Sequence, residues 1–188
     1  AGRASIELKG AELGHDLSGQ PDVVSAVVDQ VKKLEAEGWS FEAADASFEL
    51  LILDSQGKEV AFTVESWRTI VEQDAAGNVS TEATVKVHID GERIISTAEG
   101  NGPVNALDRA MRRAIVQAYP DLDTLRLVDY KVRILDEKSG TGAKTRVLIG
   151  TADGTESWST VGVHENVIAA SWRALEDAVK YGLLRRKG

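Results

Sequence analysis

The amino-acid sequence contains two copies of one unit, and this repeat constrains the fold more than any other feature. Residues 60–119 and 124–184 each show the pattern of three strands followed by one helix. An Asp-Gly pair marks the second hairpin turn of each copy, at Asp90-Gly91 and at Asp153-Gly154. Two copies are too few for a solenoid. They predict a pseudo-twofold domain, and such a domain often holds a ligand or a partner on its symmetry axis.

Short motifs also match between the two copies. Ser96-Thr97 and Ser159-Thr160 follow the Asp-Gly turns at the same separation. The predicted helices match one residue further along, and we attribute this slip to one inserted residue before the second helix. The matched helix positions are Ala106, Arg109, Ala110 and Ala114 in the first copy and Ala170, Arg173, Ala174 and Ala178 in the second.

The clearest strand pattern predicts an antiparallel sheet with one buried face. Residues 79–90 alternate cleanly between apolar or small residues and polar ones, which is typical of a strand with one face in solvent. The alternation changes phase near Ser66, and this change predicts a β-bulge in the first strand. Pro103 suits the first position of the helix that follows the third strand.

Residues 3–53 have the spacing of helices. Gly14 can end a first short helix, a longer one opens at Pro21 or Asp22 and stops at Gly38, and residues 42–53 form a third. The polar run 54–58 predicts a linker. We therefore predict an α+β chain with a helical subdomain over residues 1–56. A pseudo-twofold domain over residues 57–188 follows, built from βββα repeats at 58–120 and 121–188.

Composition excludes several classes of function. The net charge of −8 argues against a nucleic-acid partner and against an anionic membrane surface. The chain has no cysteine, so disulfides and thiolate metal sites are excluded. No apolar run reaches the roughly 18 residues that a membrane span needs. Residues 1–5 resemble neither an initiator methionine nor a signal peptide, and we expect the chain to be a piece of a longer protein.

No catalytic constellation stands out in the sequence, and the three histidines share no metal-ligand spacing. The best candidate site is the loop Gly100-Asn101-Gly102-Pro103. Glycines allow a close backbone approach to a ligand, and a helix N-terminus offers N–H groups to a carboxylate or phosphate. The alternative is that this loop is only a turn. Residues 60–188 thus predict a binding or assembly module.

Longer motifs resemble the C-terminal part of the α-isopropylmalate synthase and citramalate synthase family, and most of all its citramalate synthase branch. They cover nearly the whole chain in the same order. The stretches that carry the resemblance are residues 1–5 (AGRAS), 34–39 (LEAEGW), 41–50 (FEAADASFEL), 100–106 (GNGPVNA), 127–132 (LVDYKV), 158–163 (WSTVGV) and 166–171 (NVIAAS).

The resemblance implies a cytoplasmic acyltransferase of amino-acid biosynthesis. Its N-terminal TIM barrel condenses acetyl-CoA with a 2-oxo acid, pyruvate for citramalate synthase, and uses a divalent metal. This barrel is not in the sequence, so we expect no cofactor or metal here and no activity of the chain alone. Helical subdomains and then a dimeric regulatory domain of two βββα units follow the barrel. That domain binds the end product of the pathway as feedback inhibitor, isoleucine for citramalate synthase and leucine for isopropylmalate synthase.

The resemblance also assigns individual residues. The effector-binding loop corresponds to residues 100–106, and His15 corresponds to a histidine that one subunit lends to the active site of its neighbour. The predicted effector-binding residues are Gly100, Asn101, Gly102, Pro103, Val104, Ala106, Leu127, Tyr130, Ile134, Ala143 and Thr145. Two alternatives stay open, namely a leucine-binding regulatory domain and a module that only forms the homodimer.

Overall fold

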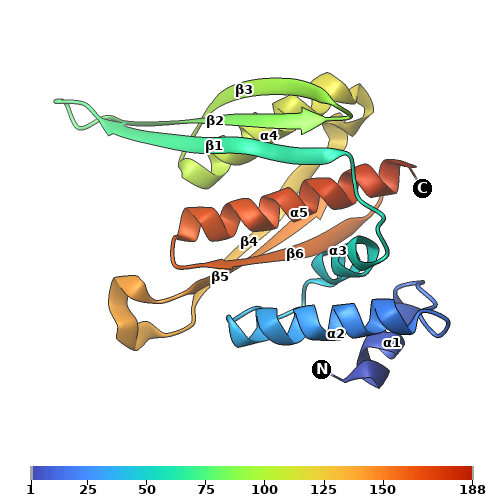
Figure 1. Cartoon of the computed structure of the whole chain (residues 1–188). Coiled ribbons are helices and arrows are strands. Elements are labelled where there is room, and N and C mark those ends of the chain that lie inside the picture. The colour runs from blue at the N-terminus through green and yellow to red at the C-terminus, as the bar shows by residue number, and fades with distance from the viewer. Residues whose placement is uncertain (1, 188) are drawn as a thin grey trace. The chain divides into compact units, whose positions relative to one another are not determined.

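A computed structural model of the chain describes residues 2–187. The strands form two three-stranded sheets, with the orders β1-β2-β3 and β4-β5-β6 (Figure 1). The predicted α+β class with two βββα repeats is confirmed. The elements are α1 (Arg3–Glu12), α2 (Pro21–Ala36), α3 (Asp45–Ser55), β1 (Phe62–Gln73), β2 (Val79–Ile89), β3 (Glu92–Gly100), α4 (Pro103–Ala118), the 3-10 helix η1 (Pro120–Thr124), β4 (Arg126–Ile134), the 3-10 helix η2 (Glu137–Gly142), β5 (Thr145–Ala152), β6 (Ser157–His164) and α5 (Val167–Lys187).

The chain divides into two compact units. The first-repeat unit comprises Val60–Val128 and Thr151–Ser157. The second-repeat unit comprises Ala1–Glu59, Asp129–Gly150 and Trp158–Gly188. The N-terminal helices therefore belong to the same unit as most of the second repeat. The predicted domain boundary between residues 56 and 57 is not tested by this division, and it stays a prediction.

In the first-repeat unit, α4 lies along one face of the β1-β2-β3 sheet (Figure 1). Val85 and Val87 of β2 are fully buried on that face, and so is Leu107 of α4. The register between β1 and β2 shifts between Val64 and Ser66, which confirms the predicted bulge. Because of the bulge, Val64 and Trp67 both lie on the inner face, opposite Val87 and Val85, although Ile70 lies on the outer face.

The hairpin turns of the two repeats differ in length. Asp90 and Gly91 both have positive φ angles, 50° and 83°, so the first copy has the predicted two-residue turn. In the second copy four residues, 153–156, separate β5 from β6. Thr97 is exposed and lies 2.9 Å from Thr84, whereas Thr160 is buried and donates to the carbonyl of Ala174. The two Ser-Thr pairs therefore do not occupy equivalent positions, and their predicted match is wrong. The slip between the two repeats thus begins in the third strand, before the helix.

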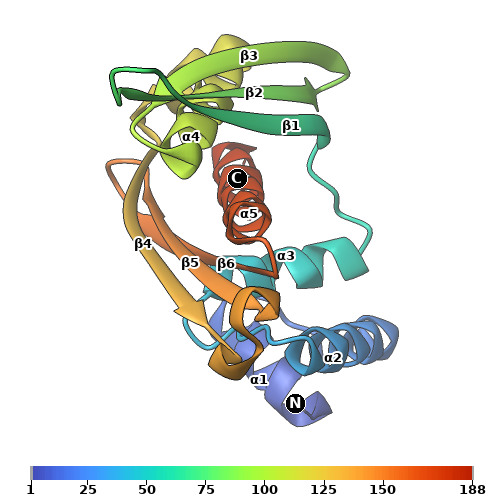
Figure 2. The ribbon, with the colours of Figure 1, turned by 90° about the vertical axis from the view of Figure 1, so that its left-hand side faces the viewer.

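In the second-repeat unit, helices cover both faces of β5 and β6 (Figure 2), whereas most residues of the edge strand β4 are exposed. On one face, Thr160 Oγ1 donates to the Ala174 carbonyl of α5 at 2.7 Å. On the other face, Leu148, Val161 and Val163 pack against the core of α1, α2 and α3. Because both faces are buried, neighbouring residues of β5 and β6 are apolar instead of alternating with polar ones.

The N-terminal helices begin and end near their predicted positions, with one correction. Pro21 opens α2, and Gly38, with a φ angle of 104°, follows its last turn. The amide of Trp39 donates to the Leu34 carbonyl and that of Gly38 to the Glu35 carbonyl, which is the Schellman pattern. The third helix starts at Asp45, not residue 42, because residues 41–44 form a turn closed by the Ala44 amide on the Phe41 carbonyl. It also extends to Ser55, so the first two residues of the predicted linker are helical.

Candidate functional site

The loop between β3 and α4 is held by its own polar groups. Pro103 occupies the first turn of α4, and Gly102 is the N-cap residue. The amide of Asn101 donates to Oδ1 of Asn105 at 3.0 Å, and the amide of Ala106 donates to the Gly102 carbonyl at 2.9 Å. The loop therefore has a defined conformation before any ligand binds.

Gly100 has a packing role in this loop. A Cβ atom at Gly100 would lie 2.5 Å from the amide nitrogen of Ala106 and 2.8 Å from its Cα, both backbone atoms that cannot move aside cheaply. Ala106 is fully buried. A glycine at this position is therefore explained by the close approach of α4 to β3, without any ligand.

Gly102 has no such role. A Cβ atom there would meet nothing within 4 Å, and the backbone is extended, so any residue could adopt it. The two glycines of the loop thus differ, because a side chain at Gly102 meets no steric obstacle whereas one at Gly100 does.

The N-terminus of α4 is not capped by any side chain that the structure describes. The N-terminus of α5 contrasts with it, since Asn166 Oδ1 accepts hydrogen bonds from the amides of Ile168 at 2.8 Å and Ala169 at 3.1 Å. Ala106 and Ala170 are matched positions of the two repeats. Gly102 precedes the first of them by as many residues as Asn166 precedes the second, so Gly102 and Asn166 are equivalent. Pro103 has no N–H group and the Ala106 amide donates to the Gly102 carbonyl, so the first turn of α4 offers the amides of Val104 and Asn105 and the positive end of the helix dipole to an external anion.

Tyr130 forms a hydrogen bond with α5. Its hydroxyl lies 2.8 Å from Ser171 Oγ, and Ser171 itself donates to the Val167 carbonyl at 2.7 Å. Ser171 has one proton, so Tyr130 is the donor in the first bond. Strand alternation places Ile134 on the same face of β4 as Tyr130. Both side chains stay substantially exposed, at 37% and 52%.

The remaining predicted residues lie in different surroundings. Thr145 and Ala143, at the start of β5 and just before it, are buried. Leu127 is on β4, but alternation places it on the face opposite Tyr130. The loop 100–106 and Leu127 belong to the first-repeat unit, whereas Tyr130, Ile134, Ala143 and Thr145 belong to the second-repeat unit. That all of them line one effector pocket stays a prediction.

His15 has a partner that sequence reasoning did not find. Its Nε2 lies 3.2 Å from Oε1 of Glu49 on α3, and both side chains are largely buried. A carboxylate beside one ring nitrogen fixes the orientation of an imidazole and suits it to proton transfer. The same geometry also serves as a simple tie between the α1–α2 loop and α3. Nothing in the sequence connects these residues, because 34 positions separate them.

Sequence reasoning also did not find two buried carboxyl groups. Asp177 of α5 accepts a hydrogen bond from Ser47 Oγ at 2.9 Å, and Ser47 Oγ accepts one from the amide of Val161 at 3.0 Å. Burial raises the pKa of Asp177, and it also raises the pKa of Asp108 on α4, which pairs with Arg112. Ser47 thus joins α3, β6 and α5 in the core of the second-repeat unit.

Metal binding and membrane insertion find no support in the described residues. Within them, no three histidine or carboxylate side chains gather closely enough to hold a metal ion. None of the helices over residues 2–187 combines the length and the apolar character that crossing a membrane requires.

Comparison with known proteins shows the family to which the chain is similar. The model of the LeuA allosteric (dimerisation) domain matches residues 42–183. The chain is 61% identical over 187 residues to (R)-citramalate synthase of Streptomyces coelicolor and 43% identical to that of Aquifex aeolicus, covering 98% of this chain and 35% of each relative. A 2-isopropylmalate synthase of Aquifex aeolicus is 31% identical over 110 residues, covering 58% of this chain and 20% of that relative. The chain thus spans about a third of the length of the citramalate synthases it matches.

Proposed function

The chain belongs to the family of LeuA allosteric (dimerisation) domains, as its motifs predicted, and from this premise we propose that it is the regulatory, dimer-forming segment of a citramalate synthase. The observation that carries the proposal is the family match over residues 42–183, which includes the first βββα repeat and all of the second except the end of α5. We further propose that its effector is isoleucine.

The citramalate branch is favoured by the extent of the matches. The citramalate synthases match 98% of the chain, from the N-terminal helices through both repeats. The 2-isopropylmalate synthase matches 58% of it. On this reading, the catalytic part, with its divalent metal and acetyl-CoA, lies in the portion of such an enzyme that this chain does not include. We expect the chain alone to be inactive.

The uncapped start of α4 supports an amino-acid effector. The carboxylate of isoleucine would accept hydrogen bonds from the first-turn amides of α4, where Gly102 leaves open space. Burying its aliphatic side chain would contribute about 1.5–3 kcal/mol. Tyr130 and Ile134 stay predicted contacts of that side chain.

An apolar row on β4 supports the homodimer. Tyr130, Val132 and Ile134 lie on one face of this edge strand, and all three are exposed. Exposed edge strands with large apolar residues are rare on monomers, because they pair or aggregate. The row equally suits the alternative in which the module only dimerises and binds no amino acid.

His15 stays a proposed catalytic residue that one subunit supplies to the barrel of another. The test is a full-length enzyme with His15→Ala, for which we expect a large loss of turnover with little change in folding. Unchanged turnover would remove His15 from catalysis and leave its contact with Glu49 a structural one.

Isothermal titration of the chain with isoleucine, leucine and valine tests the proposed effector. We expect isoleucine to bind most tightly, and Gly102→Val to abolish the heat because a β-branched side chain fills the space in front of α4. Gly19→Val is the matched control, since Gly19 also has open surroundings but lies in the α1–α2 loop. Tighter binding of leucine would move the chain to the isopropylmalate branch. No binding of any of the three to a folded dimer would support the purely structural module.

A further inference from the structure

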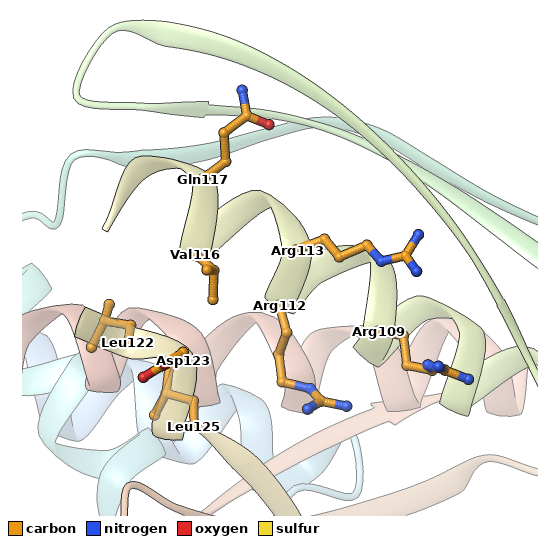
Figure 3. Close-up of a pocket in the computed structure, with 8 residues that line it drawn as sticks. All are labelled: Arg109, Arg112, Arg113, Val116, Gln117, Leu122, Asp123 and Leu125. Carbon is orange, nitrogen blue, oxygen red and sulfur yellow. The ribbon is translucent and has the colours of Figure 1, made fainter. Parts of the chain in front are cut away.

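A hollow lined by arginines lies beside α4 in the first-repeat unit. It has a volume of about 480 Å³. Figure 3 shows Arg112 and Arg113 leaving one turn of α4 in different directions and Arg109 leaving the turn before it, with Leu122 and Leu125 at the other end of the hollow. Its size lies in the range of small-molecule sites. None of these residues is part of the predicted effector site.

The charges of this hollow are arranged unfavourably for an isolated helix. Arg109 and Arg113 are four residues apart, so two like charges are neighbours on the surface of α4. The corresponding residues of α5 are Arg173 and Asp177, which have opposite charges and lie 3.5 Å apart. The second repeat therefore pairs this position within its own helix, whereas in the first repeat Arg109 and Arg113 border a neighbouring hollow that is also lined by Glu82 and Glu99.

Contacts within the unit hold two of the three guanidinium groups in place. Arg112 donates to Oδ2 of the buried Asp108 from Nε at 3.1 Å, and its second nitrogen lies 2.9 Å from the same oxygen. Arg113 donates to the Thr97 carbonyl at 2.9 Å. Each guanidinium has five N–H donors, so these bonds leave most donors available. Arg109 makes no hydrogen bond to any residue that the structure describes.

This chemistry selects a particular class of ligand. Guanidinium groups match the oxygens of a phosphate in pairs, and three of them suit a doubly charged group better than a single carboxylate. The lining has one carboxylate, Asp123, and its apolar side chains include Leu122 and Leu125. We propose that the hollow beside α4 binds a small organic phosphate, with the phosphate on the three arginines and an apolar part against the leucines. The site is separate from the proposed isoleucine site.

The test is a titration of the whole ¹⁵N-labelled chain with phenyl phosphate, followed by amide chemical shifts at constant ionic strength. We expect saturable shifts concentrated in residues 104–125. Arg109→Gln should weaken binding about tenfold, because one charge-assisted contact to phosphate is lost. Arg109→Lys keeps the positive charge but loses the planar guanidinium group, so this variant should bind phenyl phosphate with intermediate affinity. It replaces Arg109→Gln in the test if that variant folds poorly.

Arg68→Gln is the matched control. It removes one positive charge from the outer face of β1 in the same unit, away from the hollow, and it should leave the affinity within twofold. The absence of saturable shifts would overturn the proposal. An equal loss of affinity in both Gln variants would also overturn it, because only general attraction of anions would then remain. Neither result bears on isoleucine binding.

Discussion

The two repeats have the same order of elements, but they differ at the start of their helices. In the second repeat, the side chain of Asn166 closes the N-terminus of α5 with two hydrogen bonds. In the first, Gly102 stands at the matching position, and no described side chain caps α4. One copy thus satisfies its own helix end, whereas the other leaves that end uncapped.

The sheets of the two repeats also have different surroundings. Within its unit, the second sheet is covered by α5 on one face and by the core of α1–α3 on the other. The first sheet has α4 on one face, and its other face presents a polar cluster in which Glu65 accepts two hydrogen bonds from Arg93. Substitutions that affect one repeat more than the other can therefore test each difference separately.

The largest effect is expected at the glycines where a helix meets the third strand. A Cβ atom at Gly162 would overlap the Ala170 carbonyl oxygen, and one at Gly100 would press on the Ala106 backbone. Gly162→Ala and Gly100→Ala should each lower the free energy of unfolding by about 3 kcal/mol in urea denaturation. Gly102→Ala, the control, has no steric obstacle and should cost no more than about 1 kcal/mol, because glycine is a better N-cap residue than alanine. Unchanged stability of Gly162→Ala would show that the close packing of α5 is not needed.

Ser47→Ala should have the next largest effect. It leaves the buried amide of Val161 and the carboxyl group of Asp177 without their shared partner. Each unsatisfied group costs about 1–3 kcal/mol, so we expect a loss of roughly 3 kcal/mol in urea denaturation. The exposed Ser80 of β2 is the control, and Ser80→Ala should be nearly neutral. If both variants unfold alike, the contact of α3 with the second repeat contributes nothing.

Loss of the α5 cap should be smaller. Asn166→Ala removes the acceptor for the amides of Ile168 and Ala169, and we expect a cost of about 1 kcal/mol. Thermal unfolding followed by circular dichroism measures it. A midpoint equal to that of the wild type would mean that α5 does not depend on its cap, and the contrast with α4 would lose its energetic meaning.

The smallest effect is a pH dependence in the first sheet. The hydrogen bonds from Arg93 lower the pKa of Glu65 from 4.5 to about 2. A pKa lowered by folding adds stability above the unfolded value near 4.5, and this stability declines as the pH falls toward 2. The urea midpoints of wild type and Glu65→Gln should thus differ at neutral pH and converge near pH 2. Glu92→Gln, on the same sheet, is the control variant. A difference that is constant with pH would contradict this assignment.

The sequence was sufficient for features that depend on neighbouring residues. The Asp90-Gly91 turn, the bulge near Ser66 and the end of α2 at Gly38 follow from local backbone chemistry, and all three are confirmed. The packing of the N-terminal helices on the second sheet was not predicted. The consecutive apolar residues Val147, Leu148 and Ile149 fit a strand that is buried on both faces, and the prediction did not use this signal.

The candidate site could be predicted only in part, for a physical reason. The glycines of residues 100–102 stand out in the sequence, but their different roles depend on which atoms lie beside them. In the same way, Glu49 and Ser171 become partners of His15 and Tyr130 only through tertiary contacts. Sequence patterns identify a residue type that suits a site, whereas the cause of its presence is visible only in three dimensions.

The most direct test of the account transplants the cap of the second repeat into the first. In Gly102→Asn, an asparagine side chain can close α4 as Asn166 closes α5, and the open surroundings of Gly102 accommodate it. Titration with isoleucine should then show binding weakened at least about tenfold, with unchanged or slightly higher thermal stability. Isoleucine binding equal to that of the wild type would contradict the claim that the uncapped end of α4 receives the effector.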